Sequence, residues 1–260
     1  MRGFDAALRL EWVRLLTLRS TFLVVLLAFG LGAAVAVVIA AAVRGEPLDP
    51  EVGAVVLTSG GALVPLPLAA VLMAVLGVLA VGHDYRHGLV RPLLAAVPQR
   101  SALVLARLYV MTGVAAVVTV LSMVANAGLA FLVTGERPPL DAGVLRATGG
   151  YVLLVVLWTW LGAGATWLVR STPAVLTGLF LVPLLVEPLV QGLTELDTLA
   201  WLAPVARWLP FAAGRTMVLT PSPGDGAGGD LTALQGGLVF AALVSVVLAA
   251  GWVRFATSDA

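Results

Sequence analysis

Residues 83–100 read HDYRHGLVRPLLAAVPQR and form a charged island between two long, almost uncharged stretches. The island holds three arginines, two histidines and one aspartate, in a chain in which only 11% of the residues are charged. Charged side chains are costly in the hydrocarbon core of a membrane. We therefore expect the island to lie at an aqueous surface where another molecule can touch it.

The composition places the chain among integral membrane proteins. Of its 260 residues 60% are hydrophobic, and the mean hydropathy is +1.05, whereas a soluble domain carries about 25% charged residues. The net charge of +1 gives no basic field that would attract nucleic acid. The sequence thus predicts an all-α protein of the lipid bilayer, without a nucleic-acid partner.

The residue types that are absent exclude several kinds of chemistry. All the basic residues are arginine and there is no cysteine, so the chain has neither the lysine of a phosphate-binding loop nor a thiolate metal site. No Ser/His/Asp set or paired-carboxylate cleft can be read from the pattern, and the predicted cytoplasmic loops are too short for a catalytic domain. We predict no catalytic residue, no metal and no cofactor bound by this chain.

Five intervals between charged residues are long enough to cross a bilayer. They hold 23 to 32 uncharged residues, and a core of about 30 Å requires about 20 helical residues. A sixth span starts near Ser171 and is expected to end or bend near Glu187, because Pro183 interrupts it. Pro65 and Pro67 predict a kink in the over-long second span. The predicted spans cover about residues 21–43, 54–82, 104–134, 148–169, 172–188 and 231–253.

The distribution of arginine orients these helices. When alternate loops are given to the two sides, ten arginines fall on the side of the termini and the island, and five on the other. The positive-inside rule places the richer side in the cytoplasm. We therefore predict a multi-pass protein of the cell inner (plasma) membrane with both termini cytoplasmic.

The last outer loop, residues 189–230, is the longest on its side. It contains Trp201, Trp208 and Phe211, and aromatic residues are typical of interfacial or re-entrant helices at a leaflet surface. Residues 221–230 are rich in glycine and proline, which predicts a flexible link into the last span.

The first 20 residues carry an apolar stripe at helical spacing, with arginines spread around it. The stripe consists of Phe4, Leu8, Trp12, Leu15 and Leu18. Together with Arg14 and Arg19, this pattern predicts a helix that lies in the cytoplasmic interface and is attracted by anionic lipid. A ragged extension of the first span is the alternative.

Several polar and small residues stand out within the apolar stretches. His83 and His87 are four residues apart, but a metal would need further ligands, so a solvated pair is the preferred interpretation. Asn126 either lines a pathway or hydrogen-bonds between helices, the commoner use. Gly162 and Gly164 predict close helix packing.

Glu187 is the only acid within a predicted span. A proton relay or substrate contact is one interpretation. The favoured alternative places Glu187 where the span ends, in water or paired with an arginine of the outer loop, because Pro188 follows it.

The order of these features resembles the ABC-2-type transporter permeases. Family members tend to carry E-Y-R-x-G-T-x-R-x-x-L-x-x-x-P-x-R after the second span. This chain reads Asp84, Tyr85, Arg86, His87, Gly88, Leu89, Val90, Arg91, then Leu94, Pro98 and Arg100. It departs from the pattern with Asp84 in place of glutamate and Leu89 in place of threonine. The segment ALRLEWVRLLTLRST is similar to the family's E-W-x-K-L-x-x-x-R-S-T, and WLPFAAG resembles the segment before the last span.

The resemblance implies one half of a transporter. Two permease copies, identical or paralogous, would form the path, and separate ABC ATPase subunits would bind ATP and magnesium beneath them. The segment 83–101 would contain a coupling helix that docks on the ATPase, and arginine and tyrosine are good interface anchors. The docking residues implied are Asp84, Tyr85, Arg86, Gly88, Arg91, Pro98 and Arg100. The residues assigned to the interfacial helix are Trp12, Arg14 and Arg19.

Two other functions remain open at this point. An ion-coupled secondary carrier would require several ionisable groups in the membrane, and only Glu187 is available. A non-transporting membrane scaffold or immunity protein of the same fold is the third possibility. The favoured function is the permease of an ATP-driven exporter of a hydrophobic or amphiphilic compound.

Overall fold

The computed structural model describes residues 2–61, 63–64, 66–97, 99–220 and 231–257. Within these residues all regular secondary structure is helical, and six helices are long and apolar enough to cross a membrane. The structure thus confirms the all-helical class and the six candidate spans. These are α2 (Arg19–Ala42), α4 (Leu68–Arg86), α6 (Arg100–Thr134), α7 (Ala142–Val169), the composite helix Thr172–Leu193, and α12 (Ala233–Thr257).

Shorter helices connect the long ones. α1 (Arg2–Thr17) precedes α2, α3 (Pro50–Leu57) precedes α4, and α5 (Val90–Ala96) lies between α4 and α6. The composite helix consists of α8 (Thr172–Leu181), a π-helical turn (Val182–Val186) and α9 (Glu187–Leu193). A 3-10 helix (Asp197–Leu202), α10 (Ala203–Ala206) and α11 (Pro210–Arg215) follow it. Pro65, Pro98 and the predicted link 221–230 lie outside the described residues.

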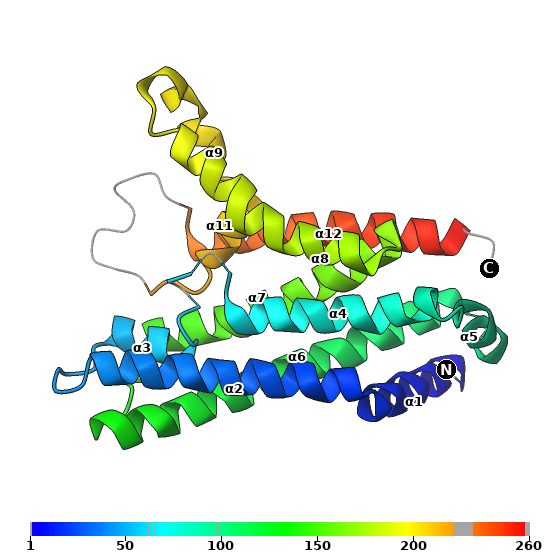
Figure 1. The fold of residues 1–260 in the computed structure, drawn as a ribbon, viewed down its shortest axis with the longest axis horizontal. Helices are drawn as coiled ribbons and strands as arrows, with labels where there is room; N and C mark the ends of the chain where they lie inside the picture. Colours follow the sequence, from blue (N-terminus) through cyan, green and yellow to red (C-terminus); the bar gives the residue numbers. More distant parts are fainter. Residues whose placement is uncertain (1, 62, 65, 98, 221–230, 258–260) are drawn as a thin grey trace.

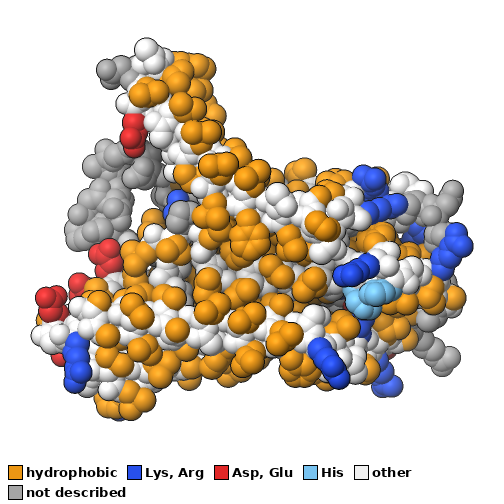
Figure 2. Space-filling view, viewed as in Figure 1, with side chains coloured by type: hydrophobic (Ala, Val, Ile, Leu, Met, Phe, Trp, Pro, Cys, Tyr) orange, Lys and Arg blue, Asp and Glu red, His pale blue; other side chains and the backbone are white. Residues whose placement is uncertain are grey.

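Most of the long helices lie side by side along the longest axis of the molecule (Figure 1). The amino-terminal helix α1, the short helix α5 and the carboxyl-terminal end of α12 gather at one end of this bundle, while α9 projects away from it. Hydrophobic side chains cover most of the face shown in Figure 2, and arginine and histidine side chains gather at the end that carries α1 and α5. The apolar surface suits contact with lipid tails.

Helix α7 is the centre of the bundle, and glycine brings its neighbours close. Two thirds of the residues in the most apolar windows of α4 and α7 are buried, against about a fifth in the other spans. A Cβ atom on Gly162 would collide with the carbonyl oxygen of Ala74 in α4, and one on Gly251 of α12 would collide with the carbonyl oxygen of Gly164. The predicted small-residue surface therefore faces two different helices and packs closely against both.

The second predicted span is broken rather than kinked. Helix α3 ends at Leu57, and Ser59 and Gly60 then adopt positive φ angles of 53° and 73°. The chain re-enters a helix only at Leu68, after Pro67. Since proline and a left-handed turn both interrupt helical hydrogen bonding, this sequence ends one helix and starts another. Asn126 of α6 compensates by donating to the Leu57 carbonyl at 3.0 Å and to the Ser59 hydroxyl at 2.8 Å.

For the span that starts near Ser171, an end near Glu187 is wrong, whereas the helix is locally distorted directly before that residue, at Val182–Val186. The chain stays helical to Leu193, because a π-helical turn accommodates the backbone hydrogen bond that Pro183 cannot make. Phe211 is buried, unlike the exposed Trp201 and Trp208. It is 8% exposed, and its ring packs at a tilt against that of Trp158, with 4.9 Å between the ring centres.

We expect Gly162→Ala to lower the free energy of unfolding by about 1–3 kcal/mol, the usual cost of overpacking. The added methyl group would push α7 away from the Ala74 carbonyl. Gly113→Ala on α6 is the matched control, because a Cβ there meets nothing within 4 Å, and alanine is the better helix former. Denaturation in detergent micelles measures both variants, and equal stability of the two would contradict the close contact of α4 and α7.

Candidate functional site

The charged island forms a helix end, a tight turn and a short helix. Helix α4 runs through Arg86, and Gly88 takes a positive φ of 64° that favours glycine. The Leu89 amide then donates to the Asp84 carbonyl at 2.9 Å, which closes the turn before α5 begins at Val90. The turn reverses the chain so that α5 lies at the end of the bundle, between α4 and α6 (Figure 1).

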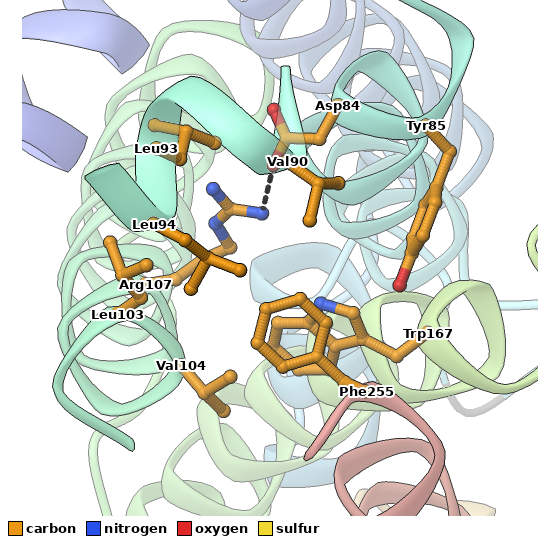
Figure 3. A pocket seen from close by; sticks show the side chains of 10 residues that line it. All are labelled: Asp84, Tyr85, Val90, Leu93, Leu94, Leu103, Val104, Arg107, Trp167 and Phe255. Carbon is orange, nitrogen blue, oxygen red and sulfur yellow. Dashed lines mark hydrogen bonds and ion pairs between the residues drawn. The ribbon is translucent and has the colours of Figure 1, made fainter. Parts of the chain in front are cut away.

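Four charged side chains meet underneath this turn. Arg107, in the third turn of α6, donates to Asp84 of α4 at 2.7 Å and to Glu11 of α1 at 2.5 Å. Figure 3 shows the Arg107 guanidinium pointing at Asp84 from beneath α5. Arg14 of α1 forms a second ion pair with Asp84 at 2.5 Å and donates to the Ala80 carbonyl at 3.0 Å. We call Glu11, Arg14, Asp84 and Arg107 the charge cluster.

The charge cluster is almost fully buried and electrically balanced. Glu11, Asp84 and Arg107 are 2%, 4% and 5% exposed, and two positive charges face two negative ones. A buried charge without a partner is strongly destabilising, whereas a paired and hydrogen-bonded one is tolerated. The cluster therefore fixes α1 to the ends of α4 and α6.

Helix α5 is packed down onto this cluster by its apolar side. Val90, Leu93 and Leu94 face the guanidinium of Arg107, together with Trp167 and Phe255 from α7 and α12 (Figure 3). The void among them is only about 20 Å³, room for roughly one water molecule. The short helix is thus packed closely against the bundle.

The residues predicted to dock a partner divide into two groups. Arg86, Gly88 and Arg91 are exposed around the turn. Asp84 is buried in the charge cluster, so its predicted place on the docking surface is wrong. The sequence suggests a surface residue here because the partners of Asp84, Arg14 and Arg107, are distant along the chain.

Two further residues of the predicted docking set also have contacts inside the bundle. Tyr85 is half-buried, and the Arg170 guanidinium lies 5.5 Å from the centre of its ring. Arg100 donates to the carbonyls of Phe255 and Ala256 at 2.7 and 3.1 Å, at the end of α12. A cation at a helix carboxyl terminus is favourable, so Arg100 stabilises the bundle.

The amino-terminal segment is a helix of its own, but its inner face differs from the predicted stripe. The helix is interrupted at Leu18, whose backbone is extended, and α2 starts at Arg19. Ala7, Glu11 and Leu15 form the buried face, while Trp12 is 51% exposed. The position of α1 in the membrane interface stays a prediction, and the exposed Trp12 is consistent with it.

Glu187 is buried at the joint between the composite helix and α11. Its two carboxylate oxygens accept hydrogen bonds from the amides of Phe211 at 2.9 Å and Ala212 at 2.7 Å. These amides open α11, so Glu187 caps that helix from another segment of the chain. Of the two favoured surroundings of Glu187, water is wrong, since the residue is only 3% exposed, whereas an arginine of the outer loop, Arg215, does lie within electrostatic reach. The pKa of the neighbouring Arg215 is lowered, because the effect of burial is larger than the opposite effect of the Glu187 carboxylate.

The two histidines do not gather a metal-ligand set. The rings of His83 and His87 lie 4.4 Å apart, yet the described part of the chain holds no group of three or more His, Cys, Asp or Glu side chains placed to bind a metal ion. The pair instead lies at the exposed end of α4, next to Arg86.

Sequence reasoning missed Glu11 and Arg107 as members of a site. A signal was present: Glu11 and Asp84 are two of the few acids on the arginine-rich side. No protein-family model matches the chain, and no curated protein matches it.

Asp84→Asn and Arg107→Gln should each lower the free energy of unfolding by about 3–5 kcal/mol, because each leaves a buried charge short of its partner. The double variant should lose less than the sum of the two, since the residues share one interaction. Unfolding in detergent measures the cycle. Asp5→Asn, an exposed acid on the same helix as Glu11, should change stability by no more than about 0.5 kcal/mol. Additive losses would argue against the charge cluster.

Glu187→Gln should lower the free energy of unfolding by about 1–3 kcal/mol, because one of the two backbone amides loses its acceptor. Hydrogen exchange of the Phe211 and Ala212 amides should become faster in this variant. The exposed Glu195→Gln serves as the control and should leave that exchange unaltered. Unchanged exchange in Glu187→Gln would refute the capping role.

Proposed function

We propose that this chain is the membrane-spanning permease subunit of an ATP-driven exporter and that a separate ATPase docks on the α4–α5 turn. The observation that supports the proposal best is the contrast within the island. Arg86 and Arg91 are exposed at the end of the bundle, whereas Asp84, two residues before Arg86, is locked into the charge cluster. An exposed anchor on a rigid base is the arrangement that a docking site for a motor requires.

The charge cluster gives docking a mechanical consequence. A force on α5 acts on α4 through the three-residue turn at positions 87–89, and on α6 through Leu93 and Leu94. Asp84 and Arg107 couple α4 to α6, and Glu11 and Arg14 add α1. Movement of a docked ATPase would therefore displace three helices together. In this proposal the island end is cytoplasmic, as the arginine distribution predicts.

The translocation path belongs to a pair of permeases in this proposal. The chain buries most of α4 and α7 but leaves large apolar side chains exposed along α2, α6 and α12. These exposed faces can meet lipid or a second copy, and the pairing of two such chains supplies a path that the packed centre of one chain does not. The proposed cargo is a hydrophobic or amphiphilic compound.

No specific observation favours the ion-coupled carrier. Its best candidate relay group is Glu187, and both carboxylate oxygens of this residue accept hydrogen bonds from the amides that open α11. The charged groups of the cluster are paired with one another. The proposed motor therefore lies outside this chain.

The double charge reversal Arg86→Glu/Arg91→Glu should weaken binding of the proposed ATPase partner by at least about tenfold, the loss of one or two interface anchors. Stimulated ATP hydrolysis should fall with it. Co-expression, affinity purification and an ATPase assay of the complex measure both effects. Arg44→Glu, an exposed arginine outside the island, is the control and should keep full binding. Wild-type binding and stimulation by the double variant would overturn the docking role.

A further inference from the structure

A recess of about 780 Å³ opens beside the island, between the end of α4 and the start of α8. Its lining includes His83, Arg86 and His87 of α4, and Arg170, Ser171 and Thr172 of the turn between α7 and α8. Among the described residues that line the recess, none is acidic. Asp84 points away from it, into the charge cluster. Figure 2 shows histidine side chains among arginines at this end of the molecule.

Arg170 is held in this recess at a conformational cost. It ends α7 in the left-handed region, at a φ of 59°, where glycine or asparagine is the usual residue. One guanidinium nitrogen donates to the Arg254 carbonyl at 3.1 Å. Its Nε atom is buried and has no partner in the described chain, as is the case for Nδ1 of His83.

The backbone around the recess is also arranged to leave polar groups facing it. A Cβ on Gly82 would collide with the hydroxyl of Thr172, so glycine allows the start of α8 to lie against α4. Ser171 occupies the cap position of α8 without a side-chain cap. The amino-terminal end of that helix therefore adds a partial positive charge to that of the arginines, and the Thr172 hydroxyl adds a hydrogen-bond donor.

Apolar side chains continue the recess into the bundle. Leu79 lies one turn before His83 on α4, and Leu176 lies one turn after Thr172 on α8. A ligand with a phosphate at one end and a hydrocarbon chain at the other would match both parts. A basic pocket between membrane helices, at the level of the lipid headgroups, is the kind of place where anionic lipid binds.

We propose that this recess binds the phosphate of an anionic phospholipid from the surrounding leaflet. Arg86 and Arg170 pair with the phosphate, the hydroxyls of Ser171 and Thr172 hydrogen-bond it, and the acyl chains follow Leu79 and Leu176. The site requires no ATPase partner. Arg86 also belongs to the proposed docking surface, whereas Arg170 does not.

The test uses the purified full chain in detergent, with dioleoylphosphatidylglycerol, dioleoylphosphatidylcholine and inorganic phosphate as separate probes, and native mass spectrometry as the measure of binding. The wild-type chain should bind phosphatidylglycerol more tightly than the zwitterionic phosphatidylcholine. Arg170→Asn, which suits the left-handed backbone, and Arg86→Gln should each weaken phosphatidylglycerol binding roughly fivefold. Neither variant should change phosphatidylcholine binding.

Arg91→Gln is the matched control, an exposed arginine of the same island that does not line the recess. It should keep phosphatidylglycerol affinity even where it weakens ATPase binding, so the two proposals fail separately. Equal binding of both lipids, or an equal loss in Arg91→Gln and Arg170→Asn, would overturn the lipid site. Inorganic phosphate that displaces phosphatidylglycerol completely would identify a soluble anion as the occupant and would also overturn it.

Discussion

The pairing of Arg107 is the constraint on which this end of the molecule depends. Its guanidinium lies among buried side chains, where an unpaired charge costs several kcal/mol even after the protein relaxes. The only carboxylates that approach it in the described structure come from α1 and α4. The positions of these two helices against α6 therefore follow from one requirement, the neutralisation of a single buried charge.

The same requirement explains how a cluster of charges exists in so apolar a chain. Helix α6 has 35 residues and is about 52 Å long, whereas the hydrocarbon core is about 30 Å thick. Arg107 lies seven residues, roughly 10 Å, from the start of this helix. A helix of this length is longer than the hydrocarbon is thick, and α1 and α5 pack against its first turns. The charges are thus hidden by protein at this end of the bundle, beneath the island.

The sequence was sufficient for the features that depend on local pattern. Long uncharged runs predicted the six long helices, and the glycines of α7 predicted close packing, because both signals are contained in neighbouring residues. The contacts of Glu11 and Asp84 could not be read in this way, since each depends on Arg107, a partner 96 and 23 residues away respectively. The effect of the prolines could not be predicted for a related reason. Whether Pro67 or Pro183 ends, bends or only distorts a helix depends on the hydrogen-bond partners that other segments provide for the unpaired backbone groups.

Those freed backbone groups also bear on how the protein works. Asn126 bonds the carbonyl that ends α3, Glu187 bonds the amides that open α11, and Arg100 and Arg170 bond carbonyls near the end of α12. Within a membrane, a helix end without such a partner costs several kcal/mol. Each of these polar side chains is thus committed to holding broken helices together, and a committed group is a poor carrier of protons or ions. The capped ends hold the separate helices of the bundle together, while Arg86 and Arg91 stay exposed at its end, where the proposed partner would bind.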